Sequence, residues 1–329
     1  MVVVLKVLQN SKVIARNFAA HFSLFRRYKS NKSMANSRFE YVKSFEQPDK
    51  LLPNCWIVIR VDGKGFHKFC NVHAFEKPND ELGLNLMNLA AVAVMQEFNE
   101  IILAYGQSDE YSFVFRRDAS VYERRKDKLI SYLCSLFTSA YLFNWSYIFK
   151  DTKTLKYPPV FDSRAVLYPT DQNIRDYLSW RQADLHINNL YNTTFWKLVA
   201  SGLTNNKAEE RLRGTFSSDK NEILFKEFDI NYNNEPIMYR KGTILVRKKV
   251  IIPDMGKQVK LIVPLFEDMI QDCFWKKHLE LLDERMKSNE VFDLGLQSNH
   301  VILQYQIEKY KKQREGSQSK LKETSGASI

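Results

Sequence analysis

The chain has 329 residues, 44% hydrophobic and 13% aromatic, and a formal net charge of +11. This length can bury one large core or two modest ones. No stretch approaches the roughly 18–20 apolar residues of a membrane-spanning helix, so we expect no membrane span. The four cysteines are scattered without a C-x-x-C pair, which argues against a zinc ribbon and a disulfide scaffold.

The positive charge is concentrated at the two ends of the chain. Residues 1–33 carry seven Lys or Arg and no acidic residue, and residues 308–329 carry six Lys or Arg against three Glu. Because +7 and +3 of the +11 lie in these ends, the residues between them carry only +1. Any RNA contact in this body must therefore come from clustered side chains and not from bulk charge.

The first 33 residues have the basic, Ser-containing and acid-free composition of a mitochondrial presequence. Met34 offers a second start, so an upstream extension without a sorting role is the alternative. We accordingly expect a mitochondrial protein, a cytoplasmic protein, or both. The basic tail, residues 286–329, is expected to run from helix into disorder.

The first half of the body predicts four strands and two helices. In chain order the expected elements are strand 56–61, helix 82–98, strands 101–105 and 111–115, helix 121–149 and strand 160–168. Asn79 is the expected N-cap of the first helix. The order β-α-β-β-α-β predicts an α+β, ferredoxin-like core with an antiparallel sheet backed by two helices.

The second half looks mainly helical. Helical patterns follow Thr170 with breaks at Gly202 and Gly214, and a strand is expected at residues 238–250. These patterns divide the chain into an N-terminal extension, a sheet-bearing core, a mainly helical half and a tail. The expected boundaries are 1–33, 34–169, 170–285 and 286–329.

Two aspartates are the strongest candidates for chemistry. Asp62 follows the first strand, and Asp109 lies in the hairpin that this topology places beside it. Two carboxylates about 4 Å apart repel by about 4 kcal/mol at an effective dielectric near 20, so the pair needs a cation or a proton. Magnesium shared with a triphosphate meets that need. Asp is also common in turns, and two ordinary turn residues remain the alternative.

Two further segments could bind nucleotide or RNA. Asp62–His67 contains two glycines that allow main-chain N–H groups to approach phosphate, although a plain turn is the alternative and no P-loop motif is present. Phe66 could stack on a base or pack in the core. Residues 181–192 are dense in amide, imidazole and phenol groups, which suits contacts with exposed bases, although a solvated helix face explains them too. Lys220 lies near an expected helix start, where phosphate could bind.

Together these segments resemble the eukaryotic type of the tRNA-histidine guanylyltransferase family, from about Met34 to about Trp275. The strings that carry the resemblance are MANS (34–37), RVDGKGFH (60–67), KPND (77–80), YGQSDEYSF (105–113), YLSWRQAD (177–184), HINNLYN (186–192) and DKNE (219–222).

The resemblance implies a polymerase-like palm, residues 34–169, that works in the reverse direction and adds a guanylate to the 5′ end of tRNA-histidine. ATP would activate the tRNA 5′-phosphate, the GTP 3′-hydroxyl would attack it, and pyrophosphate would then be removed. It further implies two Mg²⁺ ions, a homotetramer and a tRNA-contacting half at residues 170–285.

The resemblance also implies roles for individual residues. The implied catalytic residues are Asp62, Asp109 and Glu110. The implied metal ligands are Asp62, the Gly63 carbonyl and Asp109. The implied GTP-binding residues are Asp62, Gly63, Lys64, Gly65, Phe66, His67, Ser108 and Asp109. The implied phosphate contacts are Lys77, Asn79, Arg125, Lys128, Lys220 and Asn221. The implied tRNA contacts are His186, Asn188 and Asn189.

Two other functions fit the same residues. One is a template-dependent polymerase that repairs tRNA 5′ ends, which the string HINNLYN disfavours because it belongs to the guanylyltransferases. The other is a non-catalytic tRNA-binding subunit, which has no physical need for the paired Asp62 and Asp109 or for Lys220.

Overall fold

The computed structural model describes residues 37–150, 152–252, 255–283, 291–294 and 300–326. The expected presequence and the alternative start Met34 lie outside the described residues. The chain divides into two compact units, residues 1–48 and 49–329. In the first unit the described element is a short 3-10 helix, η1, at Glu40–Phe45. No helix in the described ranges is long and apolar enough to cross a membrane.

The second unit is built on one antiparallel sheet with the strand order β4-β1-β3-β2-β5-β6. The strand bounds are β1 Trp56–Gly63, β2 Ile101–Gln107, β3 Glu110–Phe115, β4 Phe161–Tyr168, β5 Thr243–Ile252 and β6 Lys257–Leu265. The first four strands alternate with helices in the predicted β-α-β-β-α-β order, so the predicted α+β fold is confirmed. The last two strands come from the mainly helical half.

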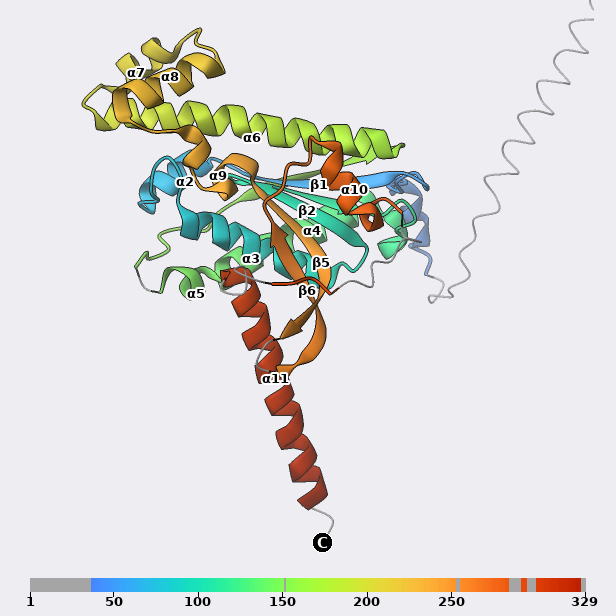
Figure 1. Cartoon of the computed structure of the whole chain (residues 1–329). Helices are drawn as coiled ribbons and strands as arrows, with labels where there is room; N and C mark the ends of the chain where they lie inside the picture. Colours follow the sequence, from blue (N-terminus) through green and yellow to red (C-terminus); the bar gives the residue numbers. More distant parts are fainter. Residues whose placement is uncertain (1–36, 151, 253–254, 284–290, 295–299, 327–329) are drawn as a thin grey trace, which may run out of the picture. The chain divides into compact units, whose positions relative to one another are not determined.

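Helices cover both faces of this sheet (Figure 1). The helices of the first half are α2 Phe66–Val72, α3 Glu81–Glu97, α4 Lys126–Phe143 and α5 Trp145–Phe149, and their apolar side chains pack with Ile57, Ile59 and Val61 of β1. The opposite face of β1, with Trp56 and Val58, packs against α6, Asp171–Ala200. The remaining elements are α7 Asn205–Leu212, α8 Ser217–Phe228, η3 Tyr232–Asn234, α9 Ile237–Lys241, α10 Asp272–Lys277, η5 Leu279–Leu281 and α11 Val301–Gly326.

Some predicted boundaries are wrong. The N-cap of α3 is Asp80, whose Oδ1 accepts the Gly83 N–H at 2.8 Å, and not Asn79. The expected helix 121–149 is divided into η2, Val121–Arg124, followed by α4 and α5, because positive φ angles at Tyr122 and Glu123 interrupt it. The expected strand at 238–250 begins only at Thr243, since α9 occupies the residues before it.

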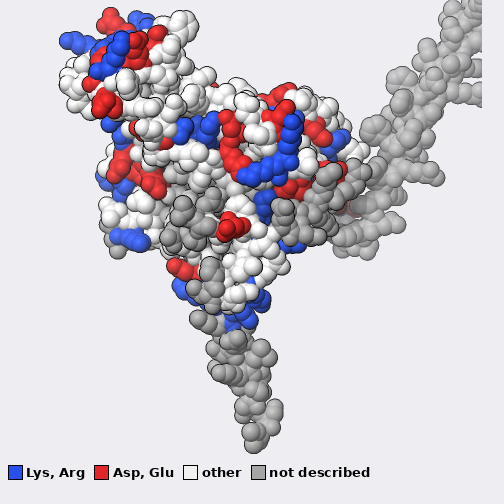
Figure 2. All heavy atoms as spheres, in the orientation of Figure 1, with Lys and Arg blue, Asp and Glu red and all other residues white. Residues whose placement is uncertain are grey.

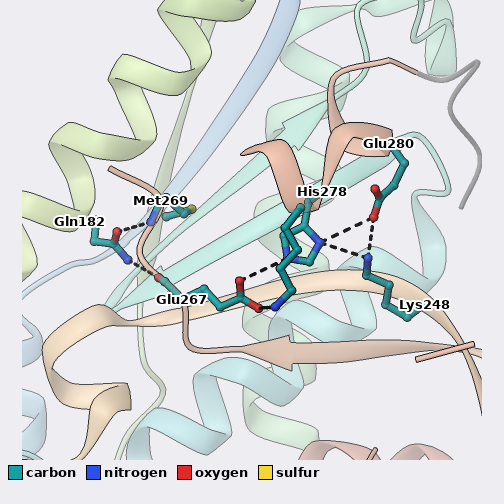
Figure 3. A network of polar contacts seen from close by, with 7 residues as sticks. Gln182, Lys248, Glu267, Met269, His278 and Glu280 are labelled. Carbon is teal, nitrogen blue, oxygen red and sulfur yellow. Dashed lines mark hydrogen bonds and ion pairs between the residues drawn. The ribbon is translucent and has the colours of Figure 1, made fainter. Parts of the chain in front are cut away.

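A polar network fastens α6 to the segment after β6 (Figure 3). Gln182 donates to the carbonyls of Lys241 (2.8 Å) and Glu267 (3.0 Å), and its Oε1 accepts the Met269 N–H at 2.7 Å. The Glu267 carboxylate in turn lies 3.4 Å from Nε2 of the buried His278. These hydrogen bonds hold α6 to the rest of the second unit near Gln182.

This network should make stability depend on pH. Burial alone would lower the pKa of His278, but hydrogen bonds to Glu267 and Glu280 outweigh it and raise that pKa above 6.5, although Lys248 opposes the charged form. A raised folded-state pKa stabilises fully below pH 6.5, and this contribution is lost as the pH rises through the folded value. We expect the melting temperature of His278→Gln to change less with pH above 6.5 than that of the wild type.

The two carboxylates contribute at the acidic end. Hydrogen bonds to His278 are the main cause that lowers the pKa of Glu267 to about 2. Burial raises the pKa of Glu280, but the hydrogen bonds to His278 and Lys248 together outweigh burial and lower that pKa to about 2 as well. Their stabilisation is therefore lost as the pH falls from about 4.5 towards 2. Melting curves from pH 2 to 9 would measure the loss of stability at both acidic and alkaline pH. If His278→Gln lost stability above pH 6.5 as the wild type does, His278 would not be the group responsible.

Candidate active site

Asp62 and Asp109 lie side by side at one end of the sheet. The register pairs Asp62 of β1 with Glu110 of β3, so the turn that carries Asp109 adjoins the end of β1. Ser108 has a φ of 50°, and this left-handed residue shapes the turn. Burial and then the negative charge of Asp62 raise the pKa of the Asp109 carboxyl. The two carboxylates therefore interact, as the topology predicts.

Two cavities meet at Asp109. One, of about 290 Å³, lies on the α6 side, and its predicted site residues are Asp62, Asn79, Ser108, Asp109, Glu110, Asn188 and Asn189. The other, of about 520 Å³, lies on the α2 and α3 side, and its predicted site residues are Phe66, His67, Lys77, Asn79, Ser108 and Asp109. Because Ser108 and Asp109 line both, ligands in the two cavities would approach each other at one carboxylate.

Glu110 is a buried anchor beside these cavities. Its carboxylate lies 3.2 Å from Arg181 Nη1 and 3.6 Å from Arg60 Nε. Burial raises the pKa of Glu110, and the two arginines act in the opposite direction. The second guanidinium nitrogen of Arg181 holds Asp184 at 2.8 Å. Glu110 thus fixes α6 against β3, and this arrangement gives it a structural role next to its predicted catalytic one.

The predicted tRNA segment lies on α6 and reaches the cavity with its amides. Asn189 accepts from Asn79 Nδ2 and donates to the Tyr232 hydroxyl, both at 2.9 Å. Asn188 donates to Asp184 at 3.3 Å. His186 packs against Tyr232 instead, and burial followed by the charge of Lys241 lowers its pKa. Asn188 and Asn189 therefore line the smaller cavity, whereas His186 does not.

The Asp62–His67 loop uses some of its main-chain donors internally. Gly63 N–H donates to the Asp109 carbonyl at 3.1 Å, and Lys64 N–H donates to Val160 at 2.8 Å. Gly65 is the N-cap of α2 with a φ of 66°. Phe66 is only 7% exposed and packs against Phe69, Tyr141 and Phe161, so the core interpretation of this side chain holds.

Gly63 admits no side chain without displacement. A Cβ there would lie 2.4 Å from the Phe66 ring and 3.0 Å from Asp109 Oδ2. We expect Gly63→Ala to displace one of these groups and to lower, about tenfold or more, the rate of the guanylate transfer that the sequence resemblance implies. Steady-state kinetics and a melting curve measure both effects. Unchanged values in both would mean that the Phe66 ring moves aside without consequence.

Arg125 and Lys128 lie away from both cavities. Arg125 pairs with Asp49 at 3.3 Å, ahead of the first residue of β1, whereas Asp62 lies near the last. Since a strand rises about 3.3 Å per residue, β1 separates them by about 20 Å. The Lys128 ammonium lies 4.5 Å from the centre of the Tyr122 ring. Within one chain the structure does not bring these two residues to Asp109.

Lys220 and Asn221 lie in the first turn of α8. The Lys220 ammonium donates to the Thr215 and Phe216 carbonyls at 2.8 and 3.4 Å and is largely buried. Asn221 is exposed. Neither residue lines the two cavities. The predicted phosphate contacts thus divide into Lys77 and Asn79, which line the cavities, and a set that does not. Within that set the Lys220 ammonium still lies 5.9 Å from the ring of Tyr191, which lines the larger cavity.

Charge is dispersed over the body. In the view of Figure 2, acidic and basic side chains intermingle on the visible face. Among the described residues, no group of three or more His, Cys, Asp or Glu is arranged to hold a metal ion. A metal between Asp62 and Asp109 would therefore take two carboxylates, with main-chain, water or substrate oxygens completing its coordination.

Two sets of residues around the cavities escaped the residue-level analysis. Arg181 and Asp184 form the anchor with Glu110, and their spacing of three on a helix was the available signal. Phe195 and Trp196 line the larger cavity beside Tyr191, which lies in the segment already expected to contact RNA, and helical periodicity alone reads these two residues as core.

Two family models match the chain. The family model described as tRNAHis guanylyltransferase matches residues 39–169, and the one described as Thg1 C terminal domain matches residues 172–325. The second match extends about fifty residues beyond the part of the chain that carries the sequence resemblance.

Relatives match over most of their length. A Drosophila melanogaster protein named "Probable tRNA(His) guanylyltransferase" is 64% identical over 250 residues, which cover 76% of this chain and 86% of that protein. The tRNA(His) guanylyltransferase of Schizosaccharomyces pombe is 55% identical over 263 residues, covering 76% and 99% of the two chains.

Solved structures agree in fold. The crystal structure of the tRNA(His) guanylyltransferase from Saccharomyces cerevisiae is 48% identical, covers 69% of this chain and 96% of that chain, and has a TM-score of 0.61. A bacterial Thg1-like protein in complex with ATP shares the fold at 22% identity, 74% and 96% coverage and a TM-score of 0.58. The same fold occurs in a bacterial GTP complex at 18% identity, 73% and 94% coverage and a TM-score of 0.53. This chain is an enzyme that belongs to the tRNAHis guanylyltransferase family.

Proposed function

We propose that this enzyme adds a guanylate to the 5′ end of tRNA-histidine. ATP activates the 5′-monophosphate of the tRNA by adenylylation and releases pyrophosphate. The 3′-hydroxyl of GTP attacks the activated phosphate, AMP leaves, and pyrophosphate is then removed from the added nucleotide. Family membership supports the reaction, and the ATP and GTP complexes of bacterial Thg1-like proteins support the two nucleotides.

The meeting of two cavities at Asp109 is the observation that carries the proposal. A transfer between two nucleotides requires two binding spaces that converge where the new bond forms. Ser108 and Asp109 occupy that place, and Asp62 lies beside them. The chain's own groups hold and orient the substrates there: Lys77 and His67 from the larger cavity, and amides of α6 from the smaller one.

We also propose that Asp62, Asp109 and the Gly63 carbonyl hold two magnesium ions. Oxygen donors are the ligands that magnesium prefers. Within the described ranges neither carboxylate has a Lys or Arg ion-pair partner, so a cation is what this half-buried pair lacks. Bound magnesium supplies positive charge to the reacting phosphate oxygens.

We propose in addition that the enzyme is a homotetramer, in which Arg125 and Lys128 reach the active site of a neighbouring copy. Arg125 lies about 20 Å from Asp62 within one chain, and Lys128 lines neither cavity, so they would serve a nucleotide only in a neighbouring copy. Light scattering of the full chain measures the mass directly. A monomer that transfers guanylate at full rate would remove these residues from the phosphate site.

One assay tests the reaction. The protein is incubated with magnesium, ATP, labelled GTP and either 5′-phosphorylated tRNA-histidine or a 5′-truncated tRNA of another identity. We expect label on tRNA-histidine. Label on the truncated tRNA alone would support 5′-end repair, and no label on either would support a non-catalytic tRNA-binding subunit.

We propose that residues 1–33 direct the protein to mitochondria, with cytoplasmic protein arising from Met34. The acid-free basic composition supports this assignment. Fractionation of cells that express the tagged chain with and without residues 1–33 tests it. Identical distributions would contradict a presequence.

A further inference from the structure

The larger cavity has an aromatic wall that the proposed reaction does not use. It lies opposite α2 and α3 and is supplied by Tyr191, Phe195 and Trp196 of α6. All three side chains are half-buried, so part of each ring is accessible. The cavity runs from this wall to Ser108 and Asp109, and its volume of about 520 Å³ can accommodate a nucleotide.

The rings of the wall are arranged in a fixed way. Tyr191 and Phe195 lie nearly parallel, with an interplanar angle of 12° and a centroid distance of 6.3 Å. Trp196 stands at 87° to Phe195 at 5.3 Å. The Trp196 ring is thus nearly perpendicular to the Phe195 ring and contacts it edge to face.

Lys77 connects this wall to the phosphate end of the cavity. Its ammonium lies 5.6 Å from the centre of the Trp196 ring, within cation–π range. Within the described ranges no carboxylate forms an ion pair with Lys77, so a triphosphate would be a stronger partner than the ring. Binding would draw the ammonium towards phosphate and leave the ring face to another flat group.

We propose that Trp196 is the residue on which the base of the nucleoside triphosphate stacks. The inference rests on the proposed function and names one positioning contact for its nucleotide. A base held against Trp196 places its triphosphate towards Lys77, His67 and Asp109, which lie along the same cavity. Every base has a π face, so this contact gives affinity for all nucleotides and does not select guanine.

Direct binding tests the stacking contact. Isothermal titration of the full chain with GTP, ATP and inorganic tripolyphosphate would compare wild type with Trp196→Leu and Trp196→Phe. We expect Trp196→Leu to weaken GTP and ATP about tenfold, with tripolyphosphate unchanged, and Trp196→Phe to restore most of the affinity. Phe143→Leu, which alters an exposed aromatic ring of α4 outside both cavities, is the matched control.

The outcomes separate this contact from the reaction itself. Equal loss of tripolyphosphate binding in Trp196→Leu, or GTP binding equal to wild type, would overturn the stacking contact while guanylate transfer by the wild type still stands. A 5′-phosphorylated RNA oligonucleotide is titrated as a fourth ligand. If Trp196→Leu weakens that RNA and not GTP, the stacked base belongs to RNA and the assignment to the triphosphate is overturned. Loss of nucleotide binding by the wild type would instead contradict the proposed function.

Discussion

Asp109→Asn is expected to lower guanylate transfer about 10³-fold while the protein keeps its melting temperature within a few degrees. The substitution keeps the shape of the side chain and removes the charge that a metal ion requires. Because Asp109 is buried beside Asp62, the loss of one like charge relieves repulsion in the free protein. Single-turnover kinetics with 5′-phosphorylated tRNA-histidine, together with a melting curve, measures both quantities.

Asp118→Asn is the matched control for this substitution. Asp118 follows β3, its side chain is 62% exposed, and it pairs with Arg116 on the surface. We expect near wild-type transfer from it. Transfer by Asp109→Asn within tenfold of the wild type would remove Asp109 from the metal site, and a large fall in melting temperature would make its role structural.

Arg181→Leu is expected to destabilise the fold by about 3 kcal/mol, a fall in melting temperature of about 6 °C. The substitution leaves the largely buried Glu110 carboxylate with the 3.6 Å contact to Arg60 and a 3.4 Å hydrogen bond from Gln107 Nε2. It also removes the ion pair between α6 and β3, so the Ser112–Tyr177 hydrogen bond at 2.7 Å remains as a polar contact between them. Denaturant unfolding of the single variants and of Arg181→Leu with Glu110→Leu measures the coupling.

The double variant should recover part of the loss, because the Glu110 carboxylate then no longer lies buried without Arg181, although Arg60 loses its contact with Glu110. Arg164→Leu is the control, since it breaks an exposed pair with Asp162 and should cost under about 1 kcal/mol. Additive losses in the double variant would contradict the buried pair. Glu110→Gln adds a separate readout: loss of transfer at unchanged stability would support the catalytic role that the resemblance assigns to Glu110.

Much of the fold could be predicted because most of its strands have a recognisable local residue composition. β1 and the two strands around Asp109 are rich in β-branched and aromatic residues, which favour strands over helices and turns. The edge strand β6 was missed because Pro264 and several lysines argue against a strand. An edge strand tolerates proline, and Pro264 pairs with Leu245 there. Edge position is a property of the whole sheet, so no local pattern could reveal it.

The candidate site was predictable only in part. Topology placed Asp62 beside Asp109, because a hairpin strand must return along β1. Asn79 and Asp80 are equally good N-caps, so only the observed bond to Gly83 decides between them. The distance of Arg125 from Asp62 and the aromatic wall around Trp196 depend on how distant segments pack. Such tertiary placement leaves no spacing signal in one sequence.

The shared sheet makes the two halves of the chain mutually dependent. Strand β5 from the second half pairs with β2 from the first, through Leu103 to Gly106. A fragment that ends near residue 169 would expose that row of N–H and C=O groups as a new sheet edge, a template for aggregation. Strand β5 therefore protects the catalytic half as well as extending it. Neither half can be exchanged or expressed alone unless another strand replaces the pairing between β2 and β5.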